Sequence, residues 1–198
     1  MIRAFVAIAL PEEVAGDLIA AQAGLPAGRP VEPGNLHLTV AFLGEHPGPV
    51  IEDAHFAFAG FRLPAFELTL EGLGLFGEPR PRVLHAGVRS EPGLTRLREK
   101  VVQAARGAGL DLGRERYQPH VTLARFNRGF DGADALRVRD FAGRGAGFRS
   151  GPFRVESFGL WRSFLGRSGP VYEEMAEYAL DLSPVRGEVG RHPGSERL

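Results

Sequence analysis

The 198-residue sequence lacks cysteine altogether, has Lys100 as its single lysine, and carries no net charge at pH 7. Without cysteine the chain can form no disulfide framework, no thiolate zinc site and no cysteine nucleophile. A net charge of zero argues against a protein that holds nucleic acid mainly through a broad cationic surface. Long apolar runs are also missing, so we expect no membrane span, no signal peptide and a cytoplasmic location.

Charge is nevertheless unevenly distributed along the chain. Residues 1–78 contain three Arg and ten Asp or Glu, which leaves 21 basic and 14 acidic residues for the rest of the sequence. We therefore expect an anionic ligand to prefer the later residues, although most of the arginines should be ordinary solvated surface side chains.

Apolar periodicity and turn residues predict strands alternating with helices in two similar halves. The predicted strands cover residues 2–10, 35–44, 66–76, 82–88, 119–126, 153–164 and 172–182, and the predicted helices cover 11–23, 50–60, 94–108 and 133–141. The length allows one large domain or two small lobes that share a cleft. Residues 183–198 are Pro, Gly and charge with few apolar residues, so we expect a flexible C-terminal tail after a single domain over residues 1–182.

One short motif occurs twice, as His37-Leu38-Thr39 and as His120-Val121-Thr122. With six His and four Thr in the chain, random placement would produce roughly 0.1 copies of His-x-Thr. Because residues i and i+2 of a strand face the same side, each copy should present an imidazole and a hydroxyl together. The middle residues, Leu38 and Val121, should then point into the core.

A pair of imidazoles suits phosphodiester chemistry at a ribose. One neutral ring can take a proton from the nucleophile while one protonated ring gives a proton to the leaving oxygen, and histidine titrates close to neutral pH. A single motif would more simply be a half-buried histidine that bonds a backbone carbonyl. Two copies in matching strand contexts favour the catalytic interpretation.

A resemblance to a known family is carried by four stretches: NLHLTVAFLG, EGLGLFGEPRPRVLHAGV, YQPHVTLARF and FRVESFGLWRSFLGRSGPVYEEMAEYAL. Together they resemble the 2H phosphoesterases, and among these the RNA 2',3'-cyclic phosphodiesterase or 2'-5' RNA ligase family, from about residue 2 to residue 182. The resemblance implies a bilobal α+β fold with a pseudo-twofold duplication. Two antiparallel β-sheets with outer helices would surround a central cleft, and the His-x-Thr strands would face each other across it.

The resemblance also implies the reaction. A 2',3'-cyclic phosphate at an RNA end, with tRNA fragments as one candidate source, would be hydrolysed to a 2'-phosphate by a monomer that uses no metal ion and no cofactor. Some relatives run a related joining reaction, in which the cyclic phosphate end is coupled to a 5'-hydroxyl through a 2'-5' linkage.

Roles carry over by matching residues to the family motifs. His37 and His120 match the catalytic histidines, Thr39 and Thr122 the hydroxyls that hold phosphate oxygens, and Arg125 a phosphate-binding arginine. On an ideal strand Arg125 would not share a face with His120, so we expect a bend or strand end to bring it round. We expect His120 to act as general base and His37 as general acid.

Three positions depart from the usual family pattern. Ala41 replaces a residue that is often basic in relatives, which removes a cleft charge. Tyr117 replaces a common Phe and keeps a ring that could stack on a base or pack in the core. His85 replaces a common Trp, and we interpret it as a structural substitution rather than a third catalyst.

Two other functions stay open at this point. The same histidines could serve a small-molecule cyclic phosphodiesterase that acts on a nucleotide or an ADP-ribose cyclic phosphate. A noncatalytic module that binds RNA ends could also keep the cleft, although binding alone does not require two intact His-x-Thr motifs. A metal enzyme is disfavoured, because neither His-x-His nor HExxH nor a compact carboxylate cluster occurs in the sequence.

Overall fold

The computed structural model describes residues 1–77, 79–113, 116–127, 130, 132–166 and 169–182. The strands within this part are β1 (Ile2–Ala9), β2 (Arg29–Pro30), β3 (His37–His46), β4 (Phe66–Phe76), β5 (Val83–Val88), β6 (His120–Arg125), β7 (Arg149–Val155), β8 (Ser157–Gly166) and β9 (Gly169–Ala179). The α-helices are α1 (Glu12–Gln22), α2 (Gly48–Ala59), α3 (Pro92–Gly107) and α4 (Gly132–Arg144). The expected tail, residues 183–198, lies outside the described residues.

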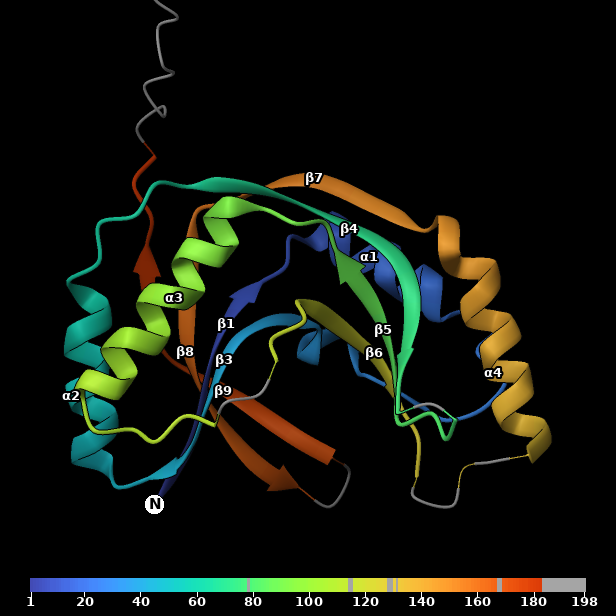
Figure 1. Ribbon diagram of the computed structural model, residues 1–198, viewed down its shortest axis with the longest axis horizontal. Coiled ribbons are helices and arrows are strands. Elements are labelled where there is room, and N and C mark those ends of the chain that lie inside the picture. Colours follow the sequence, from blue (N-terminus) through green and yellow to red (C-terminus); the bar gives the residue numbers. More distant parts are fainter. Residues whose placement is uncertain (78, 114–115, 128–129, 131, 167–168, 183–198) are drawn as a thin grey trace, which may run out of the picture.

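The strands form one antiparallel sheet in the order β7-β4-β5-β6-β3-β1-β8-β9, and β2 pairs with β6 off this path. The two halves, β7-β4-β5-β6 and β3-β1-β8-β9, meet at β3 and β6, where Leu38 pairs with Val121. Figure 1 shows the halves curving away from this junction, with α2 and α3 over one half and α1 and α4 over the other. The two expected sheets are therefore joined, and the His-x-Thr strands lie side by side rather than across from each other.

The fold is a duplication in which the halves exchange a helix. The order β1-α1-β3-α2 is repeated later in the chain as β5-α3-β6-α4. In each repeat the first helix crosses over: α1 packs on β6 and β7, whereas α3 packs on β3 and α2. Each half therefore buries part of its apolar face against a helix from the other half.

Helix α3 illustrates how the sequence specifies these elements. Its buried residues Leu94, Leu97, Val101 and Ala105 recur at helical spacing. Pro92 suits the first turn, and the carboxylate of Glu91 accepts a hydrogen bond from the Gly93 amide at 3.1 Å, which caps the helix. In the described part of the chain no helix is both long and apolar enough to cross a bilayer.

The strand predicted over residues 153–164 was wrong, because this segment forms parts of two strands. We predicted a single strand over residues 153–164, but the chain there divides at Glu156 into β7 and β8. Strand β7 pairs with β4 in one half and β8 pairs with β1 in the other. The apolar alternation shifts phase at the crossing, from the buried residues Phe153 and Val155 to the buried residues Phe158 and Leu160. The periodicity therefore marks a break at this point, but it does not reveal that the two strands pair in different halves.

Candidate active site

Both His-x-Thr motifs lie at the junction of the halves. Leu38 and Val121 pair across β3 and β6 and are fully buried, as the alternation predicted. The register of this pair sets His37 beside Thr122 and Thr39 beside His120 on the opposite face. In a regular antiparallel pair, diagonal neighbours such as the two histidines would have their Cα atoms roughly 7–8 Å apart.

The two strands share a further irregularity after the motif. In β3 the neighbours of Ala7 and Val6 are Thr39 and Ala41, so Val40 is an extra residue. In β6 the neighbours of His85 and Leu84 are Thr122 and Ala124, so Leu123 is likewise extra. A residue inserted in this way is a β-bulge, which moves the following side chains to the other face of the strand.

The bulges explain which way the side chain five positions after each histidine points. Burial follows the same order over residues 37–42 and residues 120–125, and the last residue of each stretch is exposed. That residue is Phe42 in β3 and Arg125 in β6. Both line a cavity of about 460 Å³ that also contains Phe5 and Tyr172 of the other strands. The strand irregularity that we expected to bring Arg125 round is therefore present.

Each imidazole is oriented by a backbone carbonyl two residues earlier. Nδ1 of His37 donates to the carbonyl of Asn35, and Nδ1 of His120 donates to the carbonyl of Gln118, both at 2.8 Å. This bond occupies Nδ1 and leaves Nε2 for proton transfer. In the neutral ring of His37, Nε2 accepts a hydrogen bond from the Thr39 hydroxyl at 3.0 Å.

Aromatic rings hold the imidazoles from the side. The ring of His37 lies 5.0 Å from Phe5 and 5.2 Å from Tyr172, the latter nearly perpendicular at 89°. The ring of His120 lies 4.8 Å from Phe76 and 5.4 Å from His85. Each imidazole therefore has a packed, fixed ring plane, which a proton-transfer group requires.

Burial and nearby positive charge favour the neutral form of both rings. Burial lowers the pKa of His37, and the charges of Arg125 and His120 lower it further. The pKa of His120 is also lowered, first by burial and then by Arg125. Because the charge of Arg125 lowers the pKa of both rings, all three groups lie in one site. Arg125 has no ion-pair partner among the described residues, so its guanidinium is available to an anion.

Tyr117 connects the loop before β6 to β3. Its hydroxyl donates to the carbonyl of Thr39 at 3.0 Å, and the guanidinium carbon of Arg98 lies 3.9 Å from the centre of its ring. Burial raises the pKa of Tyr117 to about 12, so the hydroxyl stays protonated. One face of the ring is thus occupied, and stacking of the ring on a base stays a prediction.

His85 packs behind His120. It is 5% exposed and stacks on Phe76 with 4.0 Å between ring centres. Burial, with a smaller effect of His120, lowers its pKa to about 4. Its Nδ1 is buried without a hydrogen-bond partner in the described part of the chain. The ring of His85 packs against that of His120, and its interpretation as a structural substitution rather than a third catalyst stays a prediction.

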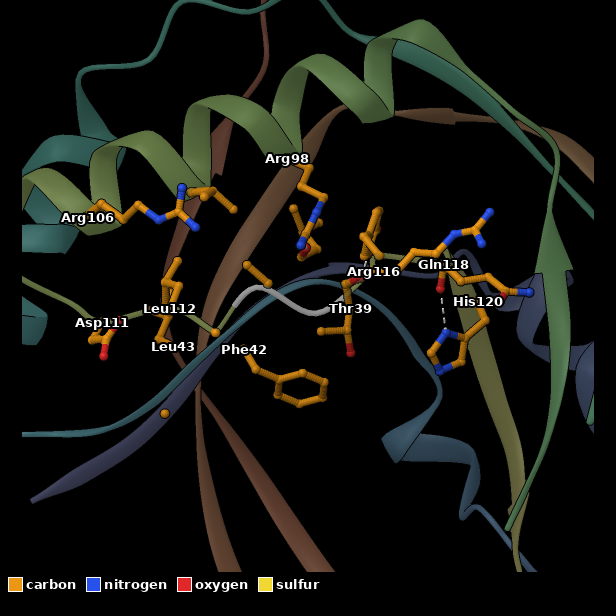
Figure 2. Close-up of a pocket in the computed structure, with 16 residues that line it drawn as sticks. Thr39, Phe42, Leu43, Arg98, Arg106, Asp111, Leu112, Arg116, Gln118 and His120 are labelled. Atoms are coloured by element: carbon orange, nitrogen blue, oxygen red, sulfur yellow. Dashed lines mark hydrogen bonds between the residues drawn. The ribbon is translucent and has the colours of Figure 1, made fainter. Parts of the chain in front are cut away.

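A second, larger cavity of about 630 Å³ adjoins the same residues (Figure 2). It runs between β3 and α3, and Thr39, Phe42 and His120 line the end that meets the motifs. Figure 2 shows Arg98 and Arg106 reaching toward it from α3. Among the described residues, no group of three or more His, Asp or Glu side chains is placed to hold a metal ion.

Sequence reasoning did not find Phe5, Phe42, Tyr172 or Arg98. Three of these residues, Phe5, Tyr172 and Arg98, belong to elements that are distant in the sequence from the His-x-Thr motifs. No local sequence pattern therefore indicates that they lie at the site. Phe42 could have been found, because it lies five residues after His37 just as Arg125 lies five residues after His120.

Comparison with known proteins places this site in context. The sequence profile of the 2'-5' RNA ligase superfamily matches residues 10–165. An RNA 2',3'-cyclic phosphodiesterase of Thermus thermophilus is 36% identical, with 96% of this chain and 93% of the relative aligned. An Escherichia coli relative with the same name is 32% identical over 90% of this chain and 96% of its own.

Two solved structures have a similar fold. The protein TT0787 of Thermus thermophilus superposes with a TM-score of 0.73 and 32% identity, covering 92% of this chain and all of that one. Escherichia coli LigT complexed with 3'-AMP superposes with a TM-score of 0.71 and 29% identity, covering 90% of this chain and 98% of that one.

Proposed function

Because the chain belongs to the 2'-5' RNA ligase superfamily, we propose that it hydrolyses RNA 2',3'-cyclic phosphate ends to 2'-phosphates through His37 and His120. The observation that carries this proposal is the pair of imidazoles at one junction, each with Nδ1 bonded to a carbonyl. Two such rings can flank a single phosphorus atom, with one Nε2 for the attacking oxygen and the other for the leaving oxygen.

The proposed reaction is an in-line displacement at phosphorus. Water attacks the cyclic phosphate, the bond from phosphorus to the ribose 3'-oxygen breaks, and the phosphate stays on the 2'-oxygen. The general base takes a proton from the water, and the general acid gives a proton to the 3'-oxygen, so that the dyad exchanges its protonation states in each turnover. If a 5'-hydroxyl of a second RNA attacks instead of water, the same groups form a 2'-5' linkage.

We assign His120 as the base and His37 as the acid on access to water. His120 lines the open cavity between β3 and α3, whereas His37 is enclosed by Phe5 and Tyr172. The bound phosphate anion would raise the pKa of His37 and so offset the lowering by burial and by Arg125.

Arg125 and the two threonines complete the proposed site. The guanidinium of Arg125, which has no ion-pair partner in the part of the chain that the structure describes, would bind the nonbridging phosphate oxygens and stabilise the charge that grows in the pentacoordinate transition state. The hydroxyls of Thr39 and Thr122 would donate to the same oxygens. The hydroxyl of Thr39 must turn from Nε2 of His37 to do so, which also frees that nitrogen for the leaving oxygen.

The test is incubation of the protein with an oligoribonucleotide ending in a 2',3'-cyclic phosphate, in the presence of EDTA. The expected product is the oligonucleotide with a 2'-monophosphate, identified by chromatography against 2'- and 3'-phosphate standards. Loss of turnover in EDTA, a 3'-phosphate product or an unchanged substrate would each contradict the proposal.

A further inference from the structure

The side chain of Gln22 lies away from the reacting groups but is bound to the strand that carries Arg125. Gln22 is the last residue of α1, is half-buried, and lines neither cavity of the site. Its amide nitrogen donates to the carbonyl of Leu123 at 2.8 Å and to the carbonyl of Val31 at 2.9 Å. Both donors of this amide therefore join α1 to segments that lie 101 and 9 residues away in the chain.

One of these two carbonyls belongs to the bulge in β6. Leu123 is the extra residue and has no opposite residue in β5, and beyond the bulge the neighbour of β6 on its other side is β2. The carbonyl of Leu123 accepts from the Val31 amide at 2.8 Å as well as from Gln22. Backbone groups that a bulge removes from the ladder need other partners. Gln22 thus holds the bulge two positions before Arg125.

The other half holds its bulge in the same way. Val40 is the extra residue in β3, and its carbonyl accepts a hydrogen bond from the guanidinium of Arg98 in α3. Helices α1 and α3 are the two that cross over between the halves. In each half the exchanged helix therefore sends a side-chain donor to the carbonyl of the bulge residue. The recurrence of this contact with two different donors indicates that the bulge carbonyl is what requires it.

We propose that Gln22 is a positioning residue for Arg125: its hydrogen bond to Leu123 holds the bulge, and the bulge turns the guanidinium toward the two histidines. The catalytic value of this role rests on the proposed function, in which Arg125 binds the phosphate. The position of the guanidinium can also be followed without any substrate, because its charge lowers the pKa of both His37 and His120.

A double-mutant cycle between Gln22→Met and Arg125→Ala tests this role, read by NMR titration of the imidazoles of His37 and His120. Met keeps the length and apolar stem of Gln but donates no hydrogen bond. We expect Gln22→Met to raise both pKa values, as Arg125→Ala does, because the guanidinium no longer lies beside the rings. Added to Arg125→Ala, Gln22→Met should raise neither pKa further.

The same cycle is measured on turnover of adenosine 2',3'-cyclic phosphate. We expect Gln22→Met to lower kcat/KM by roughly tenfold alone, the scale of coupling within one network, and by less than about twofold when Arg125 is already Ala. Gln103→Met is the matched control, because Gln103 is exposed on α3 and lines neither cavity, and it should change neither quantity. If Gln22→Met does not fold, Gln22→Asn replaces it, with a polar amide that is one methylene shorter.

The outcomes separate this role from the proposed function. Wild-type pKa values of both histidines in Gln22→Met, or equal effects of Gln22→Met with and without the Arg125 guanidinium, overturn the positioning role, while turnover of the cyclic nucleotide by the wild type still supports the reaction. Raised histidine pKa values that depend on Arg125, in a wild-type protein without turnover, support the positioning role and overturn the reaction.

Discussion

The two halves of the molecule share one backbone design but differ in the residue that this design presents to the cleft. In each half a His-x-Thr segment is followed by a bulge and then by an exposed residue five positions after the histidine. The exposed residue is Arg125 in one half and Phe42 in the other. Duplicated geometry therefore supplies two equivalent positions, one chemically suited to a phosphate and the other to a base.

The histidines differ in their surroundings in a related way. His37 is wedged between two aromatic rings and accepts a hydrogen bond from Thr39. His120 packs on Phe76 and His85 on one side and lines the open cavity between β3 and α3 on the other. Because Nδ1 of each ring bonds a backbone carbonyl, Nε2 of each ring is left for proton transfer. The rings differ in access to water, and on this difference we assign His120 as the base and His37 as the acid.

Removal of either histidine should have the largest effect. We expect His37→Ala and His120→Ala each to lower kcat by on the order of 10²-fold or more, the usual scale of a positioned acid or base. The wild-type rate should be bell-shaped in pH, with two apparent pKa values that belong to the coupled pair. The acidic limb should vanish in His120→Ala, which lacks the base, and the alkaline limb in His37→Ala, which lacks the acid.

Steady-state rates between pH 5 and 9 on a cyclic-phosphate substrate measure this difference. His46→Ala serves as the control, because His46 lines neither cavity of the site. A flat wild-type profile, or wild-type turnover in both alanine variants, would refute the paired mechanism. Interchanged limbs would reverse the assignment of acid and base.

The two threonines should differ in a subtler way. Thr39→Val and Thr122→Val should each lower kcat/KM by roughly tenfold, since each loses a hydrogen bond to the phosphate. Only Thr39→Val should also raise the pKa of His37, because the Thr39 hydroxyl bonds the neutral ring at Nε2. The pKa is followed by NMR titration of the imidazole carbon-bound protons, with Thr39→Ser as the control that keeps the hydroxyl. An unchanged His37 pKa in Thr39→Val would contradict the assigned hydrogen bond.

His85 should affect stability more than turnover. Its pKa of about 4 lies below the ordinary histidine value of 6.5, so the unfolded chain binds a proton that the folded ring refuses between these two pH values. The stabilisation is present above pH 6.5 and is lost as the pH falls toward 4, by on the order of 2 kcal/mol.

Replacing His85 with Phe should remove this contribution to the pH dependence. Urea unfolding of wild type and His85→Phe at pH 7 and pH 4.5 measures it, and the difference in unfolding free energy between the two pH values should be smaller in the variant. His37 and His120 remain in both proteins, so their own titrations largely cancel in the comparison. An identical pH dependence in both proteins would show that His85 does not titrate as described.

Much of the architecture could be predicted from local pattern. The helical spacing of Leu94, Leu97 and Val101 predicted α3, and strand alternation predicted that Leu38 and Val121 would be buried behind the His-x-Thr motifs. These features depend on residues that are neighbours in the chain, where periodicity directly reflects which side faces the core. The repeated motif likewise identified the candidate acid and base, because its two copies can be recognised without any knowledge of the fold.

Other features depend on contacts between segments that are distant in the chain. The change of partner at Glu156, the pairing of β3 with β6 and the exchange of α1 and α3 between the halves all arise from packing that local periodicity does not encode. The bulges are an intermediate case. Two apolar residues in a row mark each of them in the sequence, Val40-Ala41 and Leu123-Ala124. Only the strand pairing shows that the extra residue turns Phe42 and Arg125 to the face of the histidines. Composition and motif thus specified the chemistry of this chain, whereas long-range strand pairing placed the side chains that surround it.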